Sequence, residues 1–94
     1  MKISYVIWLD EILEKIIQKH KVRLSEVKEV LSNSTHFRFI EKGNRLGEDV
    51  YLAFGQTMAG RYITVFFVYK GNNQALVLSA RDMTKAERKK YEQK

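Results

Sequence analysis

The stretch RYITVFFVYK, Arg61–Lys70, is the most apolar run in the chain and decides the fold. Its β-branched and aromatic residues favour a strand over a helix. The apolar side chains are nearly continuous instead of alternating with polar ones. We therefore expect a central strand that is covered on both faces of a sheet.

Turn signals divide the neighbouring sequence into further strands. The sequence Gly-Asn-Asn over 71–73 turns the chain into a last strand over 75–81. On the N-terminal side, strands are expected over 35–41 and 49–56, with a turn over 42–47 between them. These strands and the central run form a four-stranded antiparallel meander.

The N-terminal third predicts a short strand over residues 3–9 and two helices. Asp10 is placed to cap a helix that runs to about His20. Ser25 is placed to cap a second helix that stops near Asn33. Both segments repeat apolar residues at helical spacing, so each helix has one face for the core.

A third helix is expected at the C-terminal end. Thr84 and Glu87 stand three residues apart, which is the spacing of a capping box. The predicted order is βααββββα. The chain of 94 residues is then one α+β domain over 1–94, with an antiparallel sheet, two N-terminal helices and one C-terminal helix.

The composition limits the kinds of site that the chain can hold. The chain has no cysteine, which excludes disulfides, thiolate nucleophiles and cysteine-based zinc sites. Its two histidines are far apart and lack a carboxylate cluster, so we expect neither a metal site nor a cofactor. The net charge of +6 favours an anionic partner, which is a nucleic acid, an acidic protein or a membrane surface.

The apolar stretch at the N-terminus is too short to span a bilayer. Asp10 and Glu11 interrupt it early, and no small-residue cleavage site follows. We therefore expect a cytoplasmic protein that does not bind membranes.

Two arginines are the leading catalytic candidates. Arg61 begins the central strand, and Arg81 ends the last strand, where alternation places it on the side of Val77 and Ser79. In the simplest antiparallel register the two guanidinium groups meet at one edge of the sheet. Such convergence is costly unless an anion is bound, and a guanidinium suits phosphate oxygens.

Each arginine also has a simpler interpretation. Arg61 has the place of a solvated residue at a strand end. Arg81 has two candidate ion-pair partners, Asp82 and Asp49. The sequence does not decide between these alternatives and a phosphate site.

The last helix carries candidates for binding RNA or a protein partner. Lys85, Arg88 and Tyr91 are spaced so that they share one face. We expect Arg88 to contact phosphate or a partner. Tyr91 is placed to stack on a base, but packing of the helix onto the sheet is favoured for it.

The histidines are the candidates for proton transfer. His20, beside Lys19 at the end of the first helix, is the preferred general base. Stabilisation of the helix C-terminus by a histidine cation competes with that role. Lys19 is a candidate for binding RNA or a partner. His36, beside Arg38, is the weaker candidate for proton transfer.

Three stretches carry a resemblance to a known family: KHKV at 19–22, AFGQTMAGRYITVFFVY at 53–69, and LSARDMTKAERKKYE at 78–92. They resemble the BrnT-type toxins of bacterial toxin–antitoxin pairs, which are small relatives of the RelE-like ribonucleases. The C-terminal stretch is the most specific. The chain has Lys21 where the family usually has a glycine, which is expected to end the first helix.

The resemblance implies a RelE-like fold and a metal-independent ribonuclease that slows translation. Enzymes of this kind cut RNA by attack of the ribose 2′-hydroxyl on the adjacent phosphate. It also implies a cognate antitoxin of the ribbon-helix-helix, BrnA-like type, acidic where it touches the toxin. That antitoxin covers the site in a hetero-oligomer and helps to repress the operon.

Two other functions remain open on the sequence alone. The first is a non-catalytic basic module, such as a degenerate toxin that binds RNA or its antitoxin without cutting. The shortage of a convincing general base supports it. The second is a peripheral membrane domain, which is disfavoured because the basic helix lacks large apolar residues on its opposite face.

Overall fold

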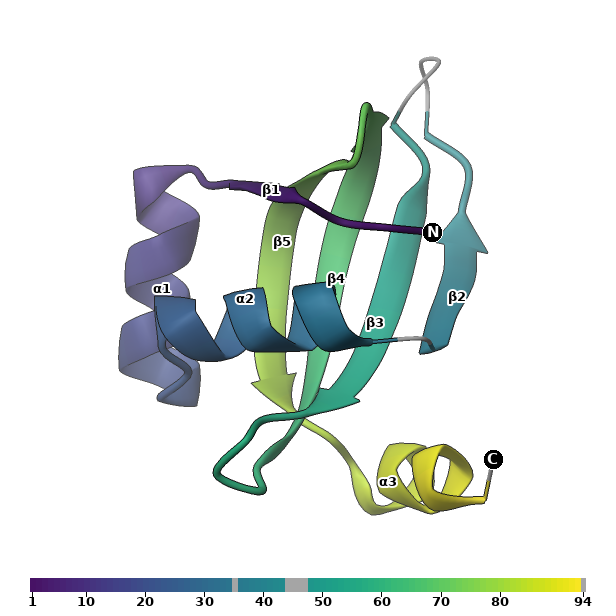
Figure 1. Cartoon of the computed structure of the whole chain (residues 1–94). Coiled ribbons are helices and arrows are strands. Elements are labelled where there is room, and N and C mark those ends of the chain that lie inside the picture. Colours follow the sequence, from purple (N-terminus) through teal and green to yellow (C-terminus); the bar gives the residue numbers. More distant parts are fainter. Residues whose placement is uncertain (35, 44–47, 94) are drawn as a thin grey trace.

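The computed structural model describes residues 1–34, 36–43 and 48–93, and the predicted order of elements is confirmed (Figure 1). Residue 35 of the strand expected over 35–41, and most of the turn expected over 42–47, lie outside the described residues. The elements are β1 (Tyr5–Ile7), α1 (Asp10–His20), α2 (Leu24–Asn33), β2 (His36–Glu41), β3 (Val50–Gln56), β4 (Tyr62–Gly71), β5 (Gln74–Asp82) and α3 (Lys85–Glu92).

The strands form one sheet in the order β1-β5-β4-β3-β2, so the apolar run is the middle strand, as predicted. Strands β2 to β5 form the expected antiparallel meander. The sheet is not antiparallel throughout, because β1 pairs in parallel with β5. The two helices carry the chain from β1 to the far edge, and the meander returns it alongside β1 in the same direction.

Helices α1 and α2 cover one face of the sheet, which we call the core face (Figure 1). Alternate residues of β4 point into it, and Ile63, Val65 and Phe67 are fully buried there. They pack with buried residues of both helices, among them Ile16 and Val30. Fully burying side chains of this kind contributes roughly 1.5–3 kcal/mol each, so this layer accounts for most of the core.

The opposite face is covered only in part, so the expectation that β4 is enclosed on both faces is half right. Helix α3 lies toward this side, and none of its residues is buried. In β4, Thr64 and Val68 are buried on this face, but Tyr62 and Phe66 remain partly exposed. We call it the α3 face.

A close contact joins α2 to β3 and fixes where β2 begins. A Cβ atom on Gly55 would lie 2.9 Å from Val30 Cγ1, so the helix rests directly on the strand. After α2, the Ser34 hydroxyl donates to the Phe54 carbonyl at 2.6 Å. It also accepts the His36 N–H at 3.1 Å. The end of the helix is thereby tied to the first residue of β2.

Within the described ranges, no helix is both long and apolar enough to cross a membrane.

Lys21 ends α1 in the left-handed conformation, with φ of 55°. The N–H of Val22 reaches back to the Ile16 carbonyl at 3.4 Å, which closes the helix. A residue with a Cβ atom is strained in this conformation, whereas glycine adopts it freely. The lysine therefore keeps the turn that glycine usually makes, at an energetic cost.

We expect Lys21→Gly to raise the free energy of unfolding by about 0.5–1 kcal/mol, because relief of this strain exceeds the added chain entropy. The control is Lys19→Gly, two residues earlier inside α1, which should lower it by about 1 kcal/mol. Urea denaturation of both variants measures the difference. Destabilisation by both substitutions would show that the Lys21 conformation carries no strain.

Candidate functional site

One row of side chains crosses four strands on the α3 face. The register pairs His36 with Phe54, and Phe54 with Thr64. It then pairs Thr64 with Arg81. Residues that are paired across antiparallel strands point to the same face, so the row runs from β2 to β5. Glu87 of α3 contacts both Thr64 and Arg81, which places the helix above the row.

Arg81 and Glu87 form a two-point ion pair. Arg81 Nη1 donates to Glu87 Oε1 at 2.7 Å, and Nη2 donates to Oε2 at 3.0 Å. The Thr64 hydroxyl and the Thr84 N–H also donate to Oε1, at 3.1 and 2.9 Å. The guanidinium is the main cause that lowers the pKa of Glu87 to about 2. The Thr84 N–H and the Thr64 hydroxyl act in the same direction, and burial opposes them. The carboxylate is therefore ionised at neutral pH.

The capping box predicted for the last helix is present. The Thr84 hydroxyl accepts the Glu87 N–H at 3.1 Å, while the Glu87 carboxylate accepts the Thr84 N–H. The same carboxylate thus starts α3 and binds Arg81. The first turn of the helix is thereby fixed to the end of β5.

A pocket of about 310 Å³ lies between α3 and the strands β2 and β3. It is lined by His36, Phe37, Arg38, Phe54, Glu87, Lys90 and Tyr91. These residues bring an imidazole, two cations, a carboxylate and aromatic rings to one place. Proton transfer and stabilisation of a developing negative charge both require groups of these types.

Aromatic contacts seat the rest of α3 on the sheet. The Tyr91 ring meets His36 edge to face at 5.5 Å between centroids, and Tyr62 at 6.0 Å. The Arg88 guanidinium lies 4.0 Å from the centroid of the Tyr62 ring, which is a cation–π contact. Tyr91 packs the helix, in agreement with the favoured interpretation, and also lines the pocket.

Arg61 lies on the core face and joins three elements. Its Nε donates to Asp82 at 2.7 Å, and its Nη1 donates to Glu26 at 3.1 Å. Nη1 also donates to the Lys21 carbonyl at 2.6 Å, and Nη2 donates to the His20 carbonyl at 3.1 Å. Its bond to Asp82 is the main cause that raises the pKa of Arg61. The side chain fastens the end of α1 and the start of α2 to β5.

The predicted convergence of Arg61 and Arg81 is wrong. Strand β5 contains a bulge, because Phe67 pairs with Val77 whereas Phe66 pairs with Ser79. The extra residue reverses the alternation, so Arg81 points to the α3 face and away from the side of Val77. Arg61 pairs with Glu26 and Asp82, so it is not a solvated residue at a strand end. The side chain of Arg81 pairs with Glu87 and with neither Asp82 nor Asp49.

The other predicted residues divide between the same two faces. Arg88 and Tyr91 contact Tyr62 on the α3 face, and Lys85 is the first residue of the same helix. Lys19 and His20 lie in the last turn of α1, where the His20 carbonyl accepts a bond from Arg61. The structure therefore brings part of the predicted set together and separates the rest. The catalytic roles given to His20 and Arg61 stay predictions, which the variants His20→Gln and Arg61→Ala in the Discussion test against a centre on the α3 face.

His36, the weaker candidate for proton transfer, is the histidine that lines the pocket. The next residue, Phe37, packs against the core, where its ring meets that of Phe67 edge to face with 6.0 Å between centroids. The alternation of a polar and an apolar residue at the start of β2 was a signal that His36 faces the other way. Its alignment with Arg81 across four strands could not be read from the sequence.

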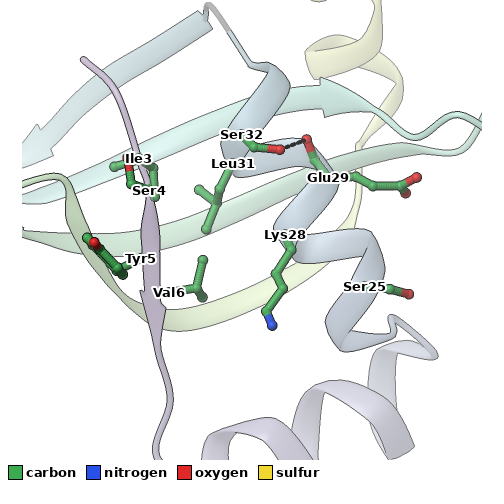
Figure 2. Close-up of a pocket in the computed structure, with 9 residues that line it drawn as sticks. All are labelled: Ile3, Ser4, Tyr5, Val6, Ser25, Lys28, Glu29, Leu31 and Ser32. Atoms are coloured by element: carbon green, nitrogen blue, oxygen red, sulfur yellow. Dashed lines mark hydrogen bonds between the residues drawn. The ribbon is translucent and has the colours of Figure 1, made fainter.

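A larger groove of about 580 Å³ lies between the N-terminal segment and α2 (Figure 2). It is lined by Ile3, Ser4, Tyr5, Val6, Ser25, Lys28, Glu29, Leu31 and Ser32. This lining has one lysine and one glutamate, and it has no imidazole or arginine. Among the described residues, no three His, Cys, Asp or Glu side chains gather closely enough to hold a metal ion.

Comparisons with known proteins identify one family. A family model described as "Ribonuclease toxin, BrnT, of type II toxin-antitoxin system" matches residues 8–87. The crystal structure of the Brucella abortus ribonuclease toxin BrnT is similar to this chain, with a TM-score of 0.60 and 20% sequence identity. The match covers 87% of this chain and 100% of that one, and at this identity it shows the fold. No curated protein matches the chain.

Proposed function

We propose that this chain, which belongs to the BrnT family of ribonuclease toxins of type II toxin–antitoxin systems, cleaves RNA on its α3 face without a metal ion. The observation that carries the proposal is the row from His36 to Arg81 beside a pocket of about 310 Å³. This arrangement places an imidazole and a guanidinium under one helix. Cleavage of cellular RNA there would slow translation.

The reaction that these groups support is attack of the ribose 2′-oxygen on the adjacent phosphorus. The P–O5′ bond breaks as the new P–O2′ bond forms, which leaves a 2′,3′-cyclic phosphate and a 5′-hydroxyl. Arg81 stabilises the negative charge that grows on the phosphate oxygens. His36 donates a proton to the departing 5′-oxygen.

The surroundings of the row supply contacts to the rest of the RNA strand. Arg38 and Lys90 line the pocket and are placed to meet neighbouring phosphates. Lys85 and Arg88 extend this positive surface along α3. Phe54 and Tyr91 offer aromatic rings on which an unpaired base stacks.

A cognate antitoxin is the partner that membership of a type II family implies. We propose an antitoxin of the ribbon-helix-helix, BrnA-like type that forms a hetero-oligomer with the chain in the cytoplasm. An acidic surface on it would complement the net charge of +6 and neutralise the toxin. Lys19, on α1, is then free to contact the antitoxin outside the RNA site. A short reading frame for such a protein beside this gene is the observation that checks the pairing.

One observation favours a second candidate function. Arg81 is already paired with Glu87, so the resting site presents no unpaired guanidinium at that point of the row. A degenerate toxin that binds RNA or its antitoxin without cutting would have this arrangement. Cleavage in vitro separates the two functions.

We expect the purified protein to cleave single-stranded RNA in the presence of a chelator, because the proposed chemistry uses only side chains. A substrate with one 2′-deoxy nucleotide at the cleaved position should bind with unchanged affinity and remain intact, since the nucleophile is missing. Gel analysis of the products should show a 2′,3′-cyclic phosphate. Tight binding of RNA without cleavage would instead favour the non-catalytic module, and a requirement for magnesium would contradict the mechanism.

A further inference from the structure

We propose that Glu87 is the resting occupant of a phosphate site on Arg81, and that it becomes the general base once an RNA phosphodiester takes its place. The inference rests on the proposed function, because it concerns the same pocket. It assigns two roles to a residue that the sequence marks only as a helix cap.

The shape of the ion pair is the first support. The guanidinium of Arg81 holds both carboxylate oxygens of Glu87, at 2.7 and 3.0 Å. The two non-bridging oxygens of a phosphodiester present the same pair of acceptors to an arginine. The carboxylate thus stands where the substrate anion would bind.

Arg81 has supports that do not depend on Glu87. Its guanidinium lies 5.2 Å from the centroid of the Phe66 ring, and Nη1 also donates to the backbone carbonyl of Asp82 at 3.2 Å. These contacts hold the side chain over the sheet while its carboxylate partner is exchanged. The site is therefore already formed before a phosphate enters it.

The two oxygens of Glu87 are held unequally. Oε1 accepts from Arg81, from the Thr64 hydroxyl and from the Thr84 N–H. In the described part of the chain, Oε2 accepts from Arg81 alone. Once a phosphate displaces the carboxylate from Arg81, the bonds from Thr64 and Thr84 to Oε1 keep Glu87 beside the phosphate, with Oε2 open to a new donor. A ribose 2′-hydroxyl is such a donor.

The transfer completes the reaction proposed above. As the O2′–P bond forms, the 2′-hydroxyl proton passes to Glu87 Oε2. As the P–O5′ bond breaks, His36 supplies a proton to the 5′-oxygen. The carboxyl group and the neutral imidazole then exchange protons with water, so both residues return to their starting forms.

The charges around the carboxylate fit this exchange. Arg38, Lys90, His36 and Tyr91 share the pocket with Glu87. Arg81 is the main cause of the low pKa of Glu87, which makes the resting carboxylate a weak base. When a phosphate anion binds Arg81, Glu87 loses its bond to the guanidinium and gains a negative charge nearby. Both changes raise the pKa of Glu87, so its carboxylate becomes a stronger base.

The test compares Glu87→Gln with Glu92→Gln, which removes the same charge from the same helix. Glutamine at position 87 still suits a capping box, so α3 should remain folded. An all-deoxy oligonucleotide serves as the binding probe because it cannot be cleaved. We expect Glu87→Gln to bind it about tenfold more tightly than the wild type, since the competing anion is gone. Glu92→Gln should gain much less, because its partner Arg88 is exposed and 3.6 Å away.

The same variant should lose cleavage while it gains affinity. We expect the kcat of Glu87→Gln on RNA to fall by about 10²–10⁴-fold, while its KM falls with the tighter binding. Equal gains in affinity for both variants would overturn the phosphate site, and unchanged cleavage would overturn the base. If the wild type does not cut RNA, the proposed function fails, but the binding comparison still tests the exchange.

A measurement on the wild type covers the case in which Glu87→Gln unfolds. The carboxyl carbon of Glu87 and the Nε–H of Arg81 should both shift in NMR spectra as the all-deoxy oligonucleotide is added. Arg61, on the core face, serves as the internal reference and should not shift. An unchanged Glu87 signal at saturating oligonucleotide would show that the pair does not open.

Discussion

Replacing His36 with glutamine is expected to lower the rate of RNA cleavage by about 10²–10⁴-fold, the usual contribution of a proton-transfer group. Glutamine is close in size and keeps the polar character of the side chain, so the pocket should retain its shape. Binding of an all-deoxy oligonucleotide should therefore change little. The measurement is the cleavage rate at saturating RNA, with folding checked by thermal denaturation.

The matched variant is His20→Gln, which alters the other histidine of the chain. His20 lies at the end of α1, and Arg61 donates to its backbone carbonyl and not to its imidazole ring. We expect cleavage within about threefold of the wild type, since a backbone contact does not require the imidazole. A loss of cleavage in His20→Gln, with His36→Gln unaffected, would move the catalytic centre to the core face.

Replacing Arg61 with alanine is expected to cost about 2 kcal/mol of folding stability. The substitution leaves Glu26 without its cation and frees two carbonyls at the end of α1. The expected loss of stability is moderate because 27% of the Arg61 side chain is exposed, so water partly replaces the lost contacts. Urea denaturation measures the loss.

The companion variant, Arg81→Ala, separates stability from chemistry. We expect it to lower cleavage by about 10²–10³-fold, which is the cost of losing one preorganised donor to the transition state. Arg61→Ala, assayed at low temperature where it is folded, should cleave nearly as fast as the wild type. If Arg61→Ala instead loses cleavage while folded, the proposed division of labour between the two arginines is wrong.

Most of the fold was predictable because its signals are local. The run over 61–70 specified a middle strand, and the turn over 71–73 specified the hairpin that follows it. The capping box of Thr84 and Glu87 placed the start of α3 within a residue. Pairing of β1 with β5 was not predictable, because it joins segments at opposite ends of the chain.

The site was only partly predictable because it depends on register. One extra residue in β5, between Val77 and Ser79, decides which face receives Arg81. No turn residue or change of composition marks that bulge. Alternation counted from Val77 therefore placed the arginine on the wrong side, whereas the α3 residues Arg88 and Tyr91 were grouped correctly by their helical spacing.

Gly55 lies where α2 packs on β3, and its small size also affects where the first residue of β2 is held. Because Gly55 has no side chain, Val30 of α2 packs directly on β3. Ser34, just after α2, bonds to the Phe54 carbonyl and to the His36 N–H, so the position of α2 also fixes the position of the His36 backbone. A methyl group there would press against Val30 and strain the turn at Ser34 that holds the His36 backbone, although it would lie on the face opposite the pocket. Under the proposed mechanism, a substitution at this hidden position would therefore lower turnover as well as stability.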